Sequence, residues 1–159
     1  MGEIHRMKHE GIYSHNCGCD RVKLSGMYGD IISLLDVPYL IVAPGMTSNI
    51  NGHIKDGLIS NGWAMDTKVH PAYNLRVNAA KNNVALTAQT GNIARAFYDL
   101  MKFQVLFTEG RINVAVLILP SHSAATNLGS NVANFNRVTN EMPLFQNIIT
   151  IPCLILSFS

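Results

Sequence analysis

The sequence predicts an α/β fold in which a central mixed β-sheet, built from an antiparallel meander and parallel strands, is flanked by helices. The run INVAVLIL at Ile112–Leu119 is continuously apolar and rich in β-branched residues, which is typical of a central strand buried on both faces. Three short extended segments, at about 64–70, 73–79 and 84–90, are separated by turn signals. Strand and helix patterns then alternate over 84–158, which predicts right-handed crossovers between parallel strands.

The elements outside the meander follow from apolar spacing and from chain breakers. In chain order, we expect helices at Met27–Leu35, Thr47–Gly62 and Ile93–Phe107, one or two short helices within 121–138, and a final buried strand at Ile148–Phe158. Asn92 is of the residue type that caps a helix N-terminus and is expected to begin the third of these helices.

Composition indicates one globular domain over residues 1–159, because 48% of the residues are hydrophobic and the length allows a sizeable core. The formal net charge is only +2, so any nucleic-acid binding must come from a local patch rather than from a long-range basic field. The apolar runs are too short to span a membrane, and the N-terminus MGEIHRMKHE lacks the apolar middle of a secretory signal. We therefore expect a cytoplasmic protein with no membrane association.

The candidate site is the stretch NNVALTAQTGNIAR at Asn82–Arg95, where a strand leads into a helix. Side chains two residues apart on a strand share a face, so Thr87 and Gln89 are expected to project together. Ligands of such sheets collect beyond strand ends and at the starts of the following helices, and Gly91 would let a phosphate approach the backbone. The alternative is an ordinary turn between strand and helix.

The same stretch resembles a known enzyme family. VALTAQTGNIARAFYDLMKFQVLF at Val84–Phe107, followed by GRINVAVLILP at Gly110–Pro120, resembles the core of the BglII/BamHI-type restriction endonucleases. In that family a strand of the form V-A-x-E-x-Q or V-x-x-E-x-E is followed by a helix and by a strand of the form I-D-V-x-V-x-I-x-P. The resemblance extends to most of the chain through YSH at Tyr13–His15, IKDGLISNGW at Ile54–Trp63 and NVANFNRVTNEMPLF at Asn131–Phe145.

The resemblance implies a restriction-endonuclease-like fold and a homodimer that grips a short palindromic duplex of DNA. It also implies hydrolysis of phosphodiester bonds with Mg²⁺, a hard cation that binds chiefly carboxylate oxygens and activates water.

The catalytic positions that the resemblance implies are Asn78, Thr87 and Gln89. Gln89 matches the family's Gln, but Thr87 stands at the position of its Glu and Asn78 at the position of its upstream Asp. Between Asp66 and Asp99 there is no Asp or Glu at all. A metal ion held by the neutral oxygens of Asn78 and Thr87 is expected to bind weakly, so cleavage is expected to be lost or impaired while DNA binding is retained.

The resemblance also implies that five polar side chains near the candidate site contact DNA, where cations and helix N-terminal groups could bind phosphate. They are Lys68, Arg76, Lys81, Asn92 and Arg95. The alternative for these residues is an ordinary solvated surface.

Three functions remain open on the sequence alone. The leading one is a DNA-binding protein on a type II restriction endonuclease scaffold that no longer cleaves efficiently. The second is an active Mg²⁺-dependent endonuclease that recruits an acid such as Asp66 or Asp99, or one from a neighbouring subunit. For Asp99, however, a structural hydrogen bond is the expected role. The third is a dimeric scaffold with no role in nucleic-acid binding.

Overall fold

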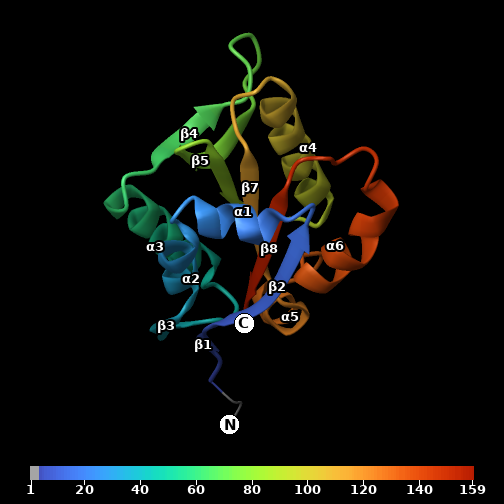
Figure 1. The fold of residues 1–159 in the computed structure, drawn as a ribbon. Coiled ribbons are helices and arrows are strands. Elements are labelled where there is room, and N and C mark those ends of the chain that lie inside the picture. Colours follow the sequence, from blue (N-terminus) through green and yellow to red (C-terminus); the bar gives the residue numbers. More distant parts are fainter. Residues whose placement is uncertain (1–3) are drawn as a thin grey trace.

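A mixed β-sheet with helices on both faces forms the centre of the molecule, which confirms the α/β class (Figure 1). The structure is a computed structural model that describes residues 4–159. Within these residues, six strands are ordered β2-β8-β7-β6-β5-β4, and β1 pairs separately with β3. The strands are β1 (Arg6–Met7), β2 (His9–His15), β3 (Val37–Ile41), β4 (Ala64–Lys68), β5 (Arg76–Lys81), β6 (Val84–Ala88), β7 (Val114–Pro120) and β8 (Cys153–Phe158).

The helices divide between the two faces of the sheet. One face is covered by α1, α2 and α3, and the other by α4 and α6 (Figure 1). The helices are α1 (Gly18–Leu24), α2 (Tyr28–Leu35), α3 (Thr47–Ser60), α4 (Ala94–Thr108), α5 (His122–Leu128) and α6 (Phe135–Glu141), followed by the 3₁₀ helix η1 (Met142–Phe145). No helix within residues 4–159 has the length and apolar character needed to cross a bilayer.

Strand β7 separates two hydrophobic cores, as expected for the continuous apolar run. Successive side chains of a strand point to opposite faces. Val116 and Ile118 accordingly belong to the core under α1, α2 and α3, whereas Ala115 and Leu117 belong to the core under α4 and α6. β7 pairs in parallel with both β6 and β8, which confirms the parallel crossovers predicted for the C-terminal half.

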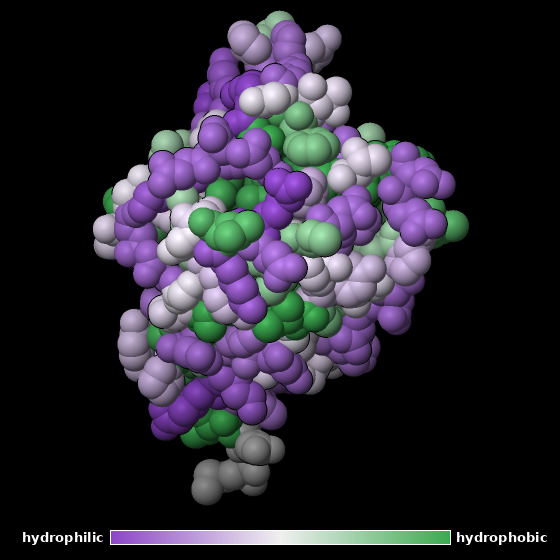
Figure 2. All heavy atoms as spheres, viewed as in Figure 1, coloured by the Kyte–Doolittle hydropathy of each residue, from purple (hydrophilic) through white to green (hydrophobic). Residues whose placement is uncertain are grey.

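Most apolar side chains lie in these two cores. The face of the molecule that Figure 2 shows is therefore mostly polar. Hydrophilic residues cover most of that face, and hydrophobic residues form small, separate patches (Figure 2).

The meander is confirmed, but its middle strand begins later than predicted. β4, β5 and β6 pair antiparallel in sequence order, and the turn between β5 and β6 is made by Asn82 and Asn83, both in the left-handed region. The strand predicted at 73–79 is Arg76–Lys81, because residues 70–75 form a hairpin loop that is closed by the Val69 N–H donating to the Leu75 carbonyl.

The final strand also starts later, at Cys153 rather than Ile148. The preceding segment is held away from the sheet by Gln104 of α4, whose Oε1 accepts hydrogen bonds from the backbone N–H groups of Thr150 and Ile151. A side chain distant in sequence thus competes with the strand tendency of this segment.

Several elements in the first 41 residues were not predicted, namely β1, β2, α1 and β3. β2 lies at the edge of the sheet, and its sequence HEGIYSH contains a single β-branched residue, so its strand tendency is weak. Pairing with β8 supplies what the local sequence lacks.

Candidate functional site

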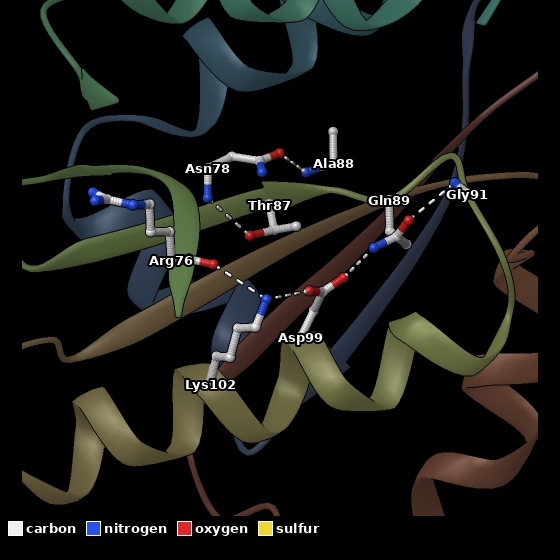
Figure 3. A network of polar contacts seen from close by, with 8 residues as sticks. All are labelled: Arg76, Asn78, Thr87, Ala88, Gln89, Gly91, Asp99 and Lys102. Atoms are coloured by element: carbon white, nitrogen blue, oxygen red, sulfur yellow. Dashed lines mark hydrogen bonds and ion pairs between the residues drawn. The ribbon is translucent and has the colours of Figure 1, made fainter. Parts of the chain in front are cut away.

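The candidate site lies where β5 and β6 end their regular pairing. Ala79 pairs with Leu86, so the next positions along the two strands are Asn78 and Thr87. At these positions, hydrogen bonds from backbone to side chain replace the regular hydrogen bonds between the two backbones. The Asn78 N–H donates to Thr87 Oγ1 at 3.2 Å, and the Ala88 N–H donates to Asn78 Oδ1 at 2.9 Å (Figure 3). Both polar side chains are therefore used to join the strands.

Thr87 and Gln89 extend toward α4, whereas the Asn78 amide lies beside Ala88 on the other side of the strand (Figure 3). The Thr87 side chain is buried, with 4% of its residue surface exposed. Asn78 instead lines a cavity of about 240 Å³ between α3 and the sheet, together with Asn51, Lys55, Asp66 and Ala88 and the apolar side chains of Ile54, Leu58 and Met65. The structure thus brings Thr87 and Gln89 to one side and separates the Asn78 amide from them.

Gln89 follows directly after β6 and is held at both ends of its side-chain amide. Its Nε2 donates to Asp99 Oδ2 at 2.5 Å, and its Oε1 accepts from the Gly91 N–H at 2.9 Å. The Gln89 N–H donates to the Ile118 carbonyl and so extends the pairing of β6 with β7 by one bond. Each polar group of this side chain has a partner inside the chain (Figure 3).

Asp99 has the structural hydrogen bond that the sequence predicted. It lies in α4 with 4% of its surface exposed, and its Oδ1 is 3.5 Å from Lys102 Nζ. Lys102 Nζ also donates to the Arg76 carbonyl at 3.2 Å, which joins α4 to β5. Burial raises the pKa of the Asp99 carboxyl above its usual value of 3.8, against the opposing effects of the Gln89 hydrogen bond and the charges of Lys102 and Arg95.

The five predicted DNA contacts lie in different places. Arg95 and Asn92 are exposed beside the Gln89–Gly91 turn, and Asn92 Oδ1 accepts from the Ala94 N–H. Arg76, the first residue of β5, donates from Nη1 to the Asp66 carbonyl. The structure separates the other two from this group.

Lys81 Nζ donates to the Asn61 carbonyl, beyond the end of α3 and at the opposite end of β5. Lys68 lines a different cavity with His70 and Arg111, close to the β4–β5 hairpin loop. The prediction that Asn92 caps α4 needs a correction, because the capping position is Ile93 and the Asn92 side chain bonds two residues ahead instead.

Helix α3 was expected only to pack against the core, and its polar side was not predicted. Ile50, Ile54 and Leu58 are buried as expected, but Asn51 and Lys55 line the cavity that contains Asn78. Their spacing of four residues places them on one face of the helix, which was the available signal. Asn51 Oδ1 also accepts from the Thr90 hydroxyl at 2.9 Å, tying α3 to the loop after β6.

The raised pKa of Asp99 predicts a specific pH dependence of stability. The folded protein binds the Asp99 proton more tightly than the unfolded chain does. The free energy of unfolding should therefore fall as pH rises from about 3.8 through the raised pKa, by at most about 1.4 kcal/mol per pH unit. Asp99→Asn should remove this pH-dependent part of the free energy of unfolding.

Urea unfolding of the wild-type protein and Asp99→Asn at a series of pH values measures the difference. Asp30→Asn, which removes the same charge at an exposed position of α2, is the control. A wild-type stability that rises with pH relative to Asp99→Asn would contradict the raised pKa.

Comparisons with known proteins agree with this fold and with the sequence resemblance. The model of the restriction endonuclease BglII/BglIII family matches residues 12–158. The crystal structure of restriction endonuclease BglII complexed with a DNA 16-mer superposes with a TM-score of 0.79 at 14% identity, covering 95% of this chain and 76% of that chain. The structure of free BglII gives a TM-score of 0.70 at 13% identity, covering 95% of this chain and 79% of the other.

None of the curated protein sequences matches. At these identities the two structures establish the likeness of fold, and the family model covers nearly the whole sequence. The chain therefore belongs to the BglII/BglIII restriction endonuclease family.

Proposed function

We propose that this protein binds a short palindromic DNA duplex on its restriction endonuclease scaffold, and that its phosphodiester cleavage is lost or strongly impaired. The observation that carries the proposal is the state of the three positions that match the family site. Asn78, Thr87 and Gln89 provide no carboxylate, and an oxygen of each already accepts a hydrogen bond from the backbone. BglII itself has been crystallised with a DNA 16-mer, which supports duplex DNA as the ligand of this scaffold.

The donor set does not fit Mg²⁺, the cofactor that the family implies. Mg²⁺ is held by one or two carboxylates with waters and substrate phosphate. Among residues 4–159, no three His, Cys, Asp or Glu side chains come together in a way that could hold a metal ion. Asp99, the acid bonded to Gln89, is buried and paired with Lys102, so a metal ion would compete with both partners for the carboxylate oxygens.

Loss of the carboxylates affects cleavage much more than binding. Each missing charge-stabilising group removes ~3 kcal/mol or more of transition-state stabilisation, roughly a hundredfold or more in rate. Binding depends instead on neutralising backbone phosphates. Arg76, Arg95 and Lys102 lie around the candidate site, and carboxylates that would repel phosphate are absent from positions 78 and 87. We infer a cytoplasmic role, since the proposed ligand is cellular DNA.

We propose that the protein acts as a homodimer through the outer face of α4. Tyr98, Met101 and Val105 recur at helical spacing and are 45%, 57% and 41% exposed. Next to α4, Leu144 and Ile148 are 78% and 65% exposed. The contact between the Phe97 and Phe145 rings, 4.9 Å apart, holds η1 against the helix. A second copy related by a two-fold axis would cover this surface and would present two equal half-sites to a palindrome.

A second candidate function is an active endonuclease that uses Asp66. One observation favours it, because Asp66 is exposed and lines the same cavity as Asn78. Asp66 contacts Arg76 through the Asp66 backbone carbonyl, so its carboxylate takes no part in that contact. The carboxylate of Asp99, by contrast, is bonded to Gln89 and Lys102. One carboxylate would still have to supply what two supply in the family.

Metal-independent binding to DNA is the first test. Duplexes selected from a random pool in EDTA should share a symmetric sequence, and log K should fall linearly with log[salt]. Arg95→Ala should reduce the magnitude of the salt slope by about 2, because one phosphate contact is lost in each half-site of the proposed homodimer. Arg21→Ala, an equal loss of charge at an exposed position of α1, should leave the slope unchanged. Selection that yields no preferred duplex would refute the proposed function.

Restoring the acids is the second test. In the double variant Asn78→Asp with Thr87→Glu, Mg²⁺ must draw the carboxylate at position 78 out of the α3 cavity toward position 87, its neighbour on β6. The variant should then cut plasmid DNA containing the selected site when Mg²⁺ is added, faster than the wild-type protein by roughly a hundredfold or more. Wild-type protein and Asp66→Asn are assayed in parallel. Discrete fragments from the wild type that disappear in Asp66→Asn would favour the second candidate function instead.

The dimer surface is tested with Met101→Glu. At a two-fold axis this change places two like charges in an apolar contact, so sedimentation velocity should show a shift from dimer to monomer. Ile59→Glu introduces the same side chain at a residue of α3 that is 51% exposed and should leave the dimer intact. A wild-type protein that sediments as a monomer, or a Met101→Glu variant that remains dimeric, would exclude this interface.

A further inference from the structure

Two loops at the edge of the candidate site are joined to each other. The Ala133 N–H donates to the Gly91 carbonyl at 2.8 Å, and the Ile93 N–H donates to the Asn131 carbonyl at 2.9 Å. Between these bonds, Asn92 forms an isolated antiparallel bridge with Val132. We call residues 89–93 and 131–133 together the paired loops. These contacts join the two backbones directly to each other.

The paired loops are anchored to α4 through Gln89. One end of its amide accepts from the Gly91 N–H, and the other end donates to Asp99 (Figure 3). The contact with Asp99 determines the orientation of the Gln89 amide, that is, the positions of its nitrogen and its oxygen. With the amide reversed, its NH₂ would face the Gly91 N–H, and its oxygen would face the Asp99 carboxylate. Only the observed orientation satisfies both neighbours, and it requires an acceptor at Asp99.

Asp99 is in turn fixed by its own surroundings. Lys102 Nζ lies 3.5 Å from Asp99 Oδ1 and also donates to the Arg76 carbonyl of β5. The same ammonium group lies 4.6 Å from the centroid of the Tyr98 ring, which holds it over the helix. Arg95 is the other charged group of α4 that acts on the carboxyl. Since Asp99 is buried, it cannot reach DNA directly.

We propose that Asp99 is a positioning residue for DNA recognition: by orienting Gln89, it holds the paired loops in the arrangement that reads the duplex. The inference rests on the proposed function, because the paired loops carry Asn92 and Asn131, which are exposed amide side chains of the type that bonds base edges. Asp99 acts on both loops through one side chain, since Gly91 connects Gln89 to Ala133.

An exchange of side chains of equal size tests the proposal. At a pH where both carboxyls are ionised, Gln89→Glu alone places two negative charges in contact and should release the paired loops. Adding Asp99→Asn should restore the contact with reversed polarity, because the new amide at position 99 donates from its nitrogen to residue 89 and accepts from Lys102 through its oxygen. The new carboxylate at position 89 still accepts from the Gly91 N–H. Gln104→Glu is the matched control. It makes the same change at a glutamine of α4 that bonds Thr150 and does not contact the paired loops.

The first readout needs no DNA. Amide hydrogen exchange at Gly91, Ile93 and Ala133, followed by NMR, should accelerate at least about tenfold in Gln89→Glu. It should return close to the wild-type rate in the double variant and stay unchanged in Gln104→Glu. Unchanged exchange in Gln89→Glu, or no recovery in the double variant, overturns the proposal. If Gln89→Glu fails to fold, the double variant decides alone, since it must fold and show wild-type protection.

The second readout is the ratio of affinities for the selected duplex and for random duplex, measured in EDTA so that the new carboxylate at position 89 cannot act through a metal. This ratio should fall about tenfold or more in Gln89→Glu and recover in the double variant. An unchanged ratio despite released loops overturns the role in recognition. If wild-type protein prefers no duplex, the proposed function has failed, whereas the exchange data still decide whether Asp99 positions the loops.

Discussion

The burial of β7 on both faces is the constraint on which the rest of the structure depends. A strand without a polar side must be covered by helices above and below and paired on both edges, because every backbone group in it needs a partner away from water. β6 and β8 supply the edges, and the two helix layers supply the cover. The C-terminal end of β6 is then fixed beside α4, which determines where Thr87 and Gln89 lie.

Electrostatics also shapes the polar contacts at the C-terminal end of β6. The carboxylates of a pair would have to be desolvated and would repel one another unless a cation lay between them. Here an amide and a hydroxyl close the gap between β5 and β6, and a second amide joins β6 to α4. The buried acid beside them, Asp99, is balanced by Lys102. The polar groups therefore satisfy one another.

Much of the fold could be predicted from the sequence because its patterns are local. The apolar run of β7, the helical spacing of α4 and the Asn82-Asn83 turn each identify their element without reference to the rest of the chain. The edge strand β2 could not be predicted in this way, because it forms through its partner β8.

The site was predicted less completely for a similar reason. The family resemblance predicted Asn78, Thr87 and Gln89 as the site, which stays a prediction, whereas Asp99 has the expected structural hydrogen bond. Strand alternation could not show that the Asn78 amide faces α3, or that Lys68 and Lys81 lie apart from Arg95. These placements depend on the local break in the β5–β6 ladder and on the course of the hairpin.

Threonine at position 87 also lets β5 and β6 pair at this position without a bound metal ion. A glutamate at this buried position would be costly without a bound cation, so an acidic version of the sheet edge would gain stability only when divalent metal is present. Thr87 instead completes the strand pairing with a neutral hydroxyl. This pairing needs no bound metal, whereas a glutamate at position 87 would couple the protein's stability to the supply of metal.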